Sequence, residues 1–307
     1  MKKVSGIIQD SIFSQNPIIK EGLSGIFRGG GKLLRPGLLL MAARFGTLQE
    51  KHFKLAAALE MLHMATLIHD DIIDDSPLRR GLPSLHSRYG KKDAVLVGDF
   101  LLSRCFVLAA EYTSQENALN LARIISIICM MEIEQNNDRF KNNISLRSYL
   151  RKIMGKSAML FSLACFTGAY EAKVSRLLCG RFRRIGYNIG IAFQIIDDIL
   201  DYSGNAEMAR KPLGTDIKAG LITMPLLCAL RLDTTGRLRG IFSRETFRPE
   251  ETGTIFSLVK SCGGVEEAAK HAESYTNRAL REIGCLPPGE NRDMLETLAR
   301  RMLVRQE

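Results

Sequence analysis

Six aspartates, arranged in two clusters, are the residues of this sequence whose types and spacing best suit chemistry. Each cluster holds carboxylates at positions i, i+1 and i+4, which places the first and last on one face of a helix. Each cluster follows a run of apolar residues. Carboxylates this close repel one another, so something should neutralise them. The clusters are Asp70, Asp71 and Asp74, and Asp197, Asp198 and Asp201.

The chemistry of these clusters favours a hard cation. Oxygen ligands without suitably spaced Cys or His favour magnesium or manganese over zinc, and magnesium commonly binds through a few carboxylates plus substrate phosphates. A single triplet could equally be a solvated helix end, but the repeat favours a metal–diphosphate clamp. A ferritin-like di-iron bundle needs a pair of Glu-x-x-His motifs, which the sequence does not have.

Two basic segments could complete a phosphate site. One follows a triple-glycine turn, whose exposed backbone N–H groups can approach a phosphate, although it is not a Walker A loop. The other comes shortly after the first aspartate cluster, and its arginines offer planar, bidentate donors. A lone histidine such as the one in this second segment is more often structural. The basic residues are Lys32, Arg35, Arg79, Arg80 and His86.

The elements that must position these residues are helices. Apolar residues recur at spacings of three and four in most windows, for example from Leu55 to Ile72, and glycine, proline and asparagine signals separate the windows. The sequence therefore predicts an all-α protein with a single domain over 1–307. Further helices are predicted at about 92–112, 117–138, 146–170, 174–202, 221–232, 252–260 and 264–284.

Composition limits the class of protein. The 307 residues are 46% hydrophobic and 25% charged, which suits a folded chain, and the net charge of +10 would attract polyanions. No aromatic-interleaved basic stripe or helix-turn-helix pattern supports nucleic acid as that polyanion. Seven scattered cysteines without a CxxC pair favour a reducing compartment. No signal peptide or membrane span is expected, so we predict a cytoplasmic protein with at most peripheral membrane contact.

Taken in order along the chain, these segments resemble the trans-isoprenyl diphosphate synthase family. Its GGK-x-x-RP, DDxxD-x(4)-RRG, KTA and FQxxDDxLD motifs correspond to Gly30–Pro36, Asp70–Gly81, Lys156–Ala158 and Phe193–Asp201. The bacterial long-chain polyprenyl synthases look most similar, particularly the catalytic component of two-subunit heptaprenyl diphosphate synthases. Three further segments carry that likeness, at Gly98–Arg104, Met131–Gln135 and Tyr149–Leu160.

The resemblance implies a helical bundle with a central apolar cavity, and a role for each matched residue. About three magnesium ions would bridge the allylic diphosphate to the two clusters, with Asp201 the weakest ligand. The diphosphate itself would contact Arg79, Lys156 and Lys211. Lys211 begins the segment Lys-Pro-Leu-Gly-Thr-Asp, which resembles the family's GKPxGxD motif except that Arg210 replaces its first glycine. Isopentenyl diphosphate would be held by Lys32, Arg35, Arg80 and His86, while Gln194 would lie beside the reacting carbons.

The same resemblance implies the reaction, which is the head-to-tail (1'-4) condensation of isopentenyl diphosphate with farnesyl or geranyl diphosphate. Relatives that make short products often carry a bulky aromatic residue five or four positions before the first aspartate, where this chain has Ala65 and Thr66. We therefore expect a long all-trans product, with Leu62 deeper along the same helix. A simpler reading of Ala65 is that it permits close helix packing.

One departure from the family pattern bears on partners. The family has a lysine after a glycine near Thr-Leu-Pro, whereas here Leu221 follows Gly220. Catalytic subunits of two-component synthases also lack this lysine, so either a homodimer or a heterodimer with a small regulatory subunit is expected. A class I terpene cyclase would have a different second metal motif. A non-catalytic partner subunit would tend to lose an aspartate motif, and this chain keeps both.

Overall fold

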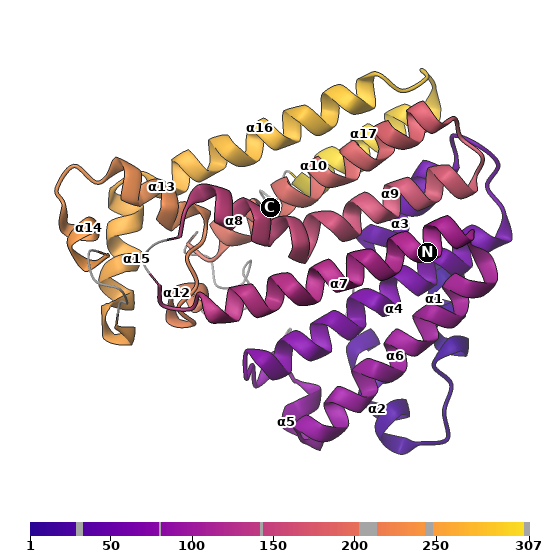
Figure 1. Ribbon diagram of the computed structural model, residues 1–307, viewed down its shortest axis with the longest axis horizontal. Coiled ribbons are helices and arrows are strands. Elements are labelled where there is room, and N and C mark those ends of the chain that lie inside the picture. The colour runs from indigo at the N-terminus through magenta and orange to yellow at the C-terminus, as the bar shows by residue number, and fades with distance from the viewer. Residues whose placement is uncertain (29–32, 80, 142–143, 203–213, 243–247, 304–307) are drawn as a thin grey trace. The chain divides into compact units, whose positions relative to one another are not determined.

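The computed structural model describes residues 1–28, 33–79, 81–141, 144–202, 214–242 and 248–303. Helices account for nearly all of its regular structure, as Figure 1 shows, which confirms the expected all-α class. The exception is a short antiparallel hairpin of β1 (Leu78–Arg79) and β2 (Leu82–Pro83). No helix of the described residues is both long and apolar enough to cross a membrane.

The chain forms two compact units, each made of two stretches of sequence. The first unit comprises Met1–Ala122 and Leu163–Arg183, and the second comprises Arg123–Ser162 and Arg184–Glu307. Because each unit draws on separate stretches, no single cut in the chain would separate them. The single domain expected from the sequence stays a prediction.

Six helices lie wholly in the first unit, where α4 is the central element. Figure 1 shows α6 running alongside α4, and α1 and α3 also pack on it. α4 and α6 are antiparallel, because Gly98 of α6 lies against His69 near the end of α4, while the Lys54 ammonium near its start lies 5.9 Å from the Tyr112 ring centroid. The helices are α1 (Lys2–Ser11), α2 (Pro17–Arg28), α3 (Leu34–Ala43), α4 (Glu50–Ile73), α5 (Leu85–Tyr89) and α6 (Lys91–Tyr112).

The elements from α8 onward, apart from α9 and α10, lie wholly in the second unit. Its hydrophobic core lies around α13 and α16, which pack on each other. Its elements are α8 (Leu146–Ile153), the π-helical turn η1 (Met154–Ala158), α12 (Thr215–Lys218), α13 (Met224–Leu232), α14 (Arg237–Ile241), the 3-10 turn η2 (Pro249–Glu251), α15 (Thr252–Ser261), α16 (Gly264–Gly284) and α17 (Glu290–Leu303). Three helices contribute to both units, namely α7 (Gln115–Asn137), α9 (Met159–Glu171) and α10 (Arg176–Leu200).

Helix boundaries follow local chemistry. α8 begins where the Ser145 hydroxyl accepts a hydrogen bond from the backbone N–H of Ser148 at 3.1 Å, an N-cap. α13 begins at Met224, three residues later than periodicity predicts, with Pro225 in its first turn. The helix predicted over 146–170 is divided, because the backbone widens into the π-helical turn η1 between α8 and α9. The helices α1, α2, α3, α5, α12, α14 and α17 were not predicted.

Candidate functional site

The first aspartate cluster lies at the end of α4. Asp70 is half-buried, Asp71 is only 6% exposed, and Asp74 is an exposed C-cap residue. The hairpin that follows brings back Arg79, whose Nε–H donates to Asp71 Oδ2 at 2.7 Å. An arginine predicted to bind diphosphate therefore neutralises one of the carboxylates. Arg80 lies outside the described residues.

His86, the histidine of the same basic segment, faces other polar groups at the start of α5. Its Nδ1 lies 3.1 Å from the Ser84 hydroxyl, and its Nε2 lies 3.9 Å from Asp75 Oδ1. Asp75 also pairs with Lys91 at 2.9 Å, and that hydrogen bond and charge lower the pKa of Asp75. Sequence reasoning assigned no role to Asp75 or Lys91, and the role of His86 stays a prediction.

Arg35, predicted to hold isopentenyl diphosphate, lies in the first turn of α3 and is 8% exposed. Its burial lowers the pKa of the guanidinium to about 10, and the negative charge of Glu60 on α4 acts in the opposite direction. The arginine is therefore held in the interior of the first unit, with a carboxylate to compensate its charge. Lys32 lies outside the described residues.

The second cluster ends α10 and is more deeply buried than the first. Asp198, which is 4% exposed, accepts hydrogen bonds from the Tyr149 hydroxyl at 2.5 Å, from Gln194 Nε2 at 3.1 Å and from the backbone N–H of Met224 at 3.3 Å. These donors come from α8, α10 and α13. Segments distant in the sequence thus converge on one carboxylate.

The other two aspartates of this cluster differ from Asp198. Asp197 is half-buried. Asp201 is almost completely buried, and its Oδ2 accepts a hydrogen bond from the backbone N–H of Asp216 at 3.2 Å, at the start of α12. This hydrogen bond helps to position α12. Asp201 therefore has a structural role, whether or not it also binds metal.

The electrostatics of the second cluster suit a cation. Burial, the largest cause, and the charges of Asp216 and Asp197 together raise the pKa of Asp198 to about 7, although the hydrogen bonds from Tyr149 and Gln194 act in the opposite direction. A divalent cation would relieve this excess of negative charge. The described residues contain no group of three or more Asp, Glu, His or Cys side chains placed to hold a metal by themselves. Magnesium would fit by taking its remaining ligands from water and diphosphate.

The π-helical turn η1 carries the residues of the KTA-like motif. The Ser157 hydroxyl donates to Gln194 Oε1 at 2.6 Å, which fixes the amide so that its nitrogen can donate to Asp198. The Lys156 Nζ lies 3.5 Å from Glu132 Oε1 on α7. π-Helical turns occur frequently at functional sites. Lys211 lies outside the described residues.

This hydrogen-bond network includes functional candidates that sequence reasoning missed. Tyr149 and Ser157 stand within segments that carry the family resemblance, and Asp216 ends the segment Lys-Pro-Leu-Gly-Thr-Asp, so each had a signal without an assigned role. Glu132 lies in the Met131–Gln135 segment. Their roles depend on contacts between segments, which spacing alone does not reveal.

The residues predicted to set chain length lie on α4 in the first unit. Leu62 and Ala65 are buried, and the Thr66 hydroxyl donates to the backbone oxygen of His63 at 2.8 Å. An apolar cavity of about 30 Å³ lies nearer the start of the helix, where Leu55, Ala58 and Leu59 line it. At 3.6 residues per turn, Leu55, Leu59 and Thr66 lie within about 60° of Asp70 around α4, whereas Ala65 lies about 140° from it, next to Leu62 and Ala58.

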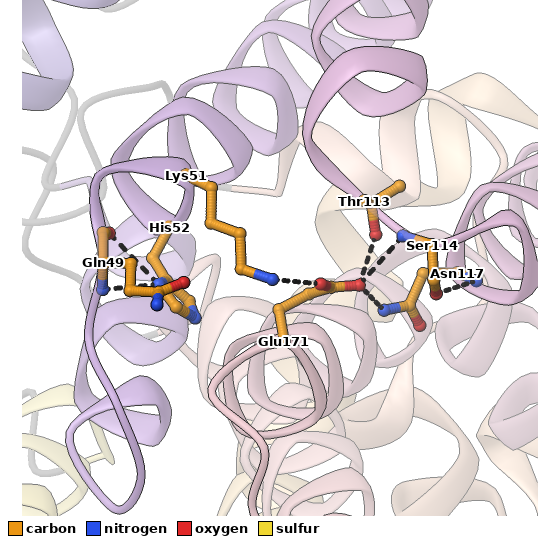
Figure 2. A network of polar contacts seen from close by, with 7 residues as sticks. All are labelled: Gln49, Lys51, His52, Thr113, Ser114, Asn117 and Glu171. Carbon is orange, nitrogen blue, oxygen red and sulfur yellow. Dashed lines mark hydrogen bonds and ion pairs between the residues drawn. The ribbon is translucent and has the colours of Figure 1, made fainter.

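A polar network stands beside this cavity, at the end of α9 (Figure 2). Glu171 Oε2 accepts from Lys51 Nζ at 2.7 Å. Its Oε1 accepts from the Thr113 hydroxyl at 2.7 Å, the Ser114 backbone N–H at 3.1 Å and Asn117 Nδ2 at 2.7 Å. Burial favours the neutral acid, but these hydrogen bonds outweigh it and lower the pKa of Glu171 to about 2. The carboxylate is therefore ionised at neutral pH.

Comparison with known sequences gives consistent results. The family model for polyprenyl synthetase matches residues 16–259. The chain is 34% identical over 293 residues to heptaprenyl diphosphate synthase component 2 of Geobacillus stearothermophilus, covering 95% of this chain and 91% of that protein. It is also 34% identical over 308 residues to the geranyl-diphosphate-specific all-trans-nonaprenyl-diphosphate synthase of Rhodobacter capsulatus, covering 97% and 92%.

Solved structures show the same likeness. Heptaprenyl diphosphate synthase from Staphylococcus aureus matches with a TM-score of 0.95 and 29% identity, covering 100% of this chain and 97% of that one. Polyprenyl synthase from Caulobacter crescentus, complexed with calcium and isoprenyl diphosphate, matches with a TM-score of 0.92 and 34% identity, covering 100% and 95%.

Proposed function

Because the chain belongs to the polyprenyl synthetase family, we propose that its aspartate clusters hold magnesium and diphosphate for the condensation of isopentenyl diphosphate with an allylic diphosphate. The chain is a prenyltransferase that makes a long all-trans polyprenyl diphosphate, as its heptaprenyl and nonaprenyl relatives do. The assignment of residues to steps is the part that we propose.

In the proposed reaction, the C1–O bond of the allylic diphosphate breaks and its electron pair leaves with pyrophosphate. The double bond of isopentenyl diphosphate attacks the resulting cation at C1, and a proton then leaves the new chain to pyrophosphate. Magnesium, when bound, neutralises charge on the leaving diphosphate. No protein nucleophile is required, so the protein contributes positioning and charge compensation.

The observation that carries this proposal is the network around Asp198. Ser157 and Tyr149 fix Gln194 and Asp198 in one orientation, and the buried carboxylate has a raised pKa that favours binding of a cation. Such a preorganised group supports a metal–diphosphate site better than a solvated acidic helix end would. The Caulobacter structure, with calcium and isoprenyl diphosphate, is consistent with this chemistry in a relative.

The basic residues take the remaining roles in the proposal. Arg79, Lys156 and Lys211 bind the allylic diphosphate, and Lys32, Arg35, Arg80 and His86 bind isopentenyl diphosphate. For Arg79 and Lys156, this requires the substrate to compete with Asp71 and Glu132, their present partners. An exchange of a carboxylate partner for a diphosphate retains charge compensation in both states.

We also propose that the exposed face of α6 binds a second protein chain. Leu96 is 57% exposed and Phe106 is 42% exposed, and each stands beside an exposed valine, Val95 or Val107. These two apolar pairs lie about three turns apart on one side of α6, with the exposed Asp99 between them. Clustered exposed apolar residues with polar neighbours mark interaction surfaces. A second copy of this chain is the expected partner, and a small regulatory subunit is the alternative, which the component 2 relative favours.

The experiment that tests the function is product analysis by mass spectrometry. Purified protein is incubated with magnesium, farnesyl or geranyl diphosphate and labelled isopentenyl diphosphate. We expect long prenyl products that are lost in Asp70→Ala and retained in Asp293→Ala, a control for an exposed aspartate on α17. No incorporation with any starter would show that the chain needs a partner subunit or that the residue assignment is wrong.

A second experiment tests the path of the product. Replacing the buried Ala65 with Phe should shorten the product, because the ring would project from the face of α4 that also carries Leu62 and Ala58. An unchanged product distribution would contradict this path and support the alternative that Ala65 serves only helix packing.

A further inference from the structure

The apolar cavity of the first unit has a polar end. It is lined by aliphatic side chains of α4 and by Cys105 and Ala109 of α6, but also by Thr113 and Asn117. Because α4 and α6 are antiparallel, the last two residues lie at the level where α4 begins, farthest from Asp70. The cavity therefore leads from apolar walls to the network around Glu171 that Figure 2 shows.

The distance along α4 indicates how much of a prenyl chain would fit. Lys51 precedes Asp70 by five helical turns, or ~28 Å at 1.5 Å per residue. An extended chain advances ~1.2 Å per bond, so an isoprene unit of four bonds spans roughly 5 Å. A chain whose diphosphate is held at Asp70 would reach the level of Lys51 after about six units. Leu59 and Leu55 would be passed earlier, at ~16 and ~22 Å.

The polar network around Glu171 is an unfavourable environment for the hydrocarbon end of a product that reaches the level of Lys51. Glu171 and Lys51 form a partly buried ion pair, and its carboxylate is held by three further donors. Asn117 is 3% exposed, and its Oδ1 is buried without a hydrogen-bond partner among the described residues. A water molecule in the cavity would satisfy this acceptor, whereas a hydrocarbon end would leave it unsatisfied.

We propose that Lys51, Thr113, Asn117 and Glu171 form a polar floor that stops growth of the product at about six isoprene units. This inference rests on the proposed function and adds a determinant of product size several turns away from Ala65. The small side chain of Ala65 allows the growing prenyl chain to pass along α4, and the polar floor limits how far the chain extends. Asn117 is the specificity-determining residue of the four, because it both lines the cavity and donates to Glu171.

The test measures binding separately from turnover. All-trans prenyl diphosphates of three to eight units are titrated into the full chain by calorimetry with magnesium present. In the wild type, affinity should rise with each unit until about six and then stop rising, because further units meet the floor. We call the chain length at which affinity stops rising the break. In Asn117→Ala the break should move to chains longer by at least one unit. In Ala109→Leu, which fills the cavity before the floor, it should move to shorter chains.

Tyr170→Phe is the matched control, since it removes a hydroxyl next to Glu171 in the sequence that donates instead to Glu116, at 2.8 Å. Its break should stay at the wild-type length. A break that stays at the wild-type length in Asn117→Ala would overturn the floor. If Asn117→Ala does not fold by circular dichroism, Thr113→Val decides in its place, because Thr113 also lines the cavity and donates to Glu171. Shifted breaks without any incorporation of isopentenyl diphosphate would support the floor and contradict condensation by the chain on its own.

Discussion

At the scale of single residues, the environment of a carboxylate decides what it can do. Asp198 and Glu171 are both buried and both hydrogen-bonded, yet their pKa values shift in opposite directions. Asp198 stands close to Asp216 and Asp197, so burial and like charge raise its pKa, whereas Glu171 faces Lys51 and three neutral donors. The first carboxylate is suited to recruit a cation, and the second already has one.

The hydrogen bond from Tyr149 should matter to metal binding. It lowers the pKa of Asp198, so Tyr149→Phe should raise that pKa above about 7 and leave more of the acid protonated at neutral pH. Protons compete with the cation for Asp198. For a hydrogen bond of ~1.5 kcal/mol, the magnesium concentration for half-maximal activity should therefore rise by about sevenfold at pH 7, and the difference from the wild type should shrink at higher pH.

Magnesium titrations of activity between pH 6 and 9 would measure this effect. Tyr187→Phe is the control, because it removes a hydroxyl from α10, the helix that carries Asp198. This variant should keep the wild-type magnesium requirement. An equal loss of activity at every pH and magnesium concentration would point to a structural role for Tyr149 instead.

Glu171 should stabilise the fold in a pH-dependent way. Its pKa falls from 4.5 to about 2 on folding, so its contribution is fully present above pH 4.5 and is lost as the pH falls toward 2. Glu171→Gln should therefore lower the free energy of unfolding by about 3 kcal/mol at pH 7, and the difference from the wild type should narrow below pH 4.5.

Urea unfolding at pH 7, 5 and 3 would measure the difference for Glu171→Gln. The control is Glu116→Gln, an exposed carboxylate that accepts a hydrogen bond from Tyr170 and should change stability little. A difference of the same size at all three values of pH would mean that the charge of Glu171 is not what stabilises the fold.

At the scale of elements, close helix packing holds the π-helical turn η1 in place. A Cβ added to Gly190 of α10 would lie 2.5 Å from the Cα of Ala158, and one added to Gly155 would lie 2.3 Å from Cγ of Met131. Both distances are too short for any side chain. The glycines thus allow α10 and α7 to approach the turn that carries Lys156 and Ser157.

Gly190→Ala should force α10 away from η1. We expect the free energy of unfolding to fall by about 1–3 kcal/mol through overpacking, and activity to fall further because Gln194 would lose its register with Ser157. Gly240→Ala on α14, where an added Cβ meets nothing within 4 Å, should be neutral or slightly stabilising. Denaturant unfolding and steady-state kinetics of both variants would decide, and equal behaviour would contradict close packing at Gly190.

At the scale of the whole molecule, the exposed apolar residues of α6, which include Leu96 and Phe106, form the surface that we propose to bind a second chain. Leu96→Glu combined with Phe106→Glu should place charges in the interface and give monomers, by light scattering coupled to size-exclusion chromatography. Leu177→Glu, at a leucine that is 73% exposed on α10, should leave the assembly unchanged. A wild-type monomer would instead favour a heterodimer, whose partner the wild type should bind and the double variant should not.

The sequence by itself determined the helical class, the two aspartate motifs and the family, because apolar periodicity and motif spacing are local properties of the chain. It also identified His86, Lys156 and Gln194 as candidates, although their roles stay predictions. Short or weakly periodic helices such as α1 and α17 escaped prediction, since packing against other helices stabilises them more than their own pattern does.

Only the tertiary structure decided how deeply each carboxylate is buried and what it contacts. Tyr149 reaches Asp198 across 49 residues of sequence, and Lys51 reaches Glu171 across 120. The contact between Asp201 and the start of α12 could not be predicted from the spacing of the aspartates. Burial and hydrogen bonds between remote segments set charge and pKa, and these depend on packing that no local pattern encodes.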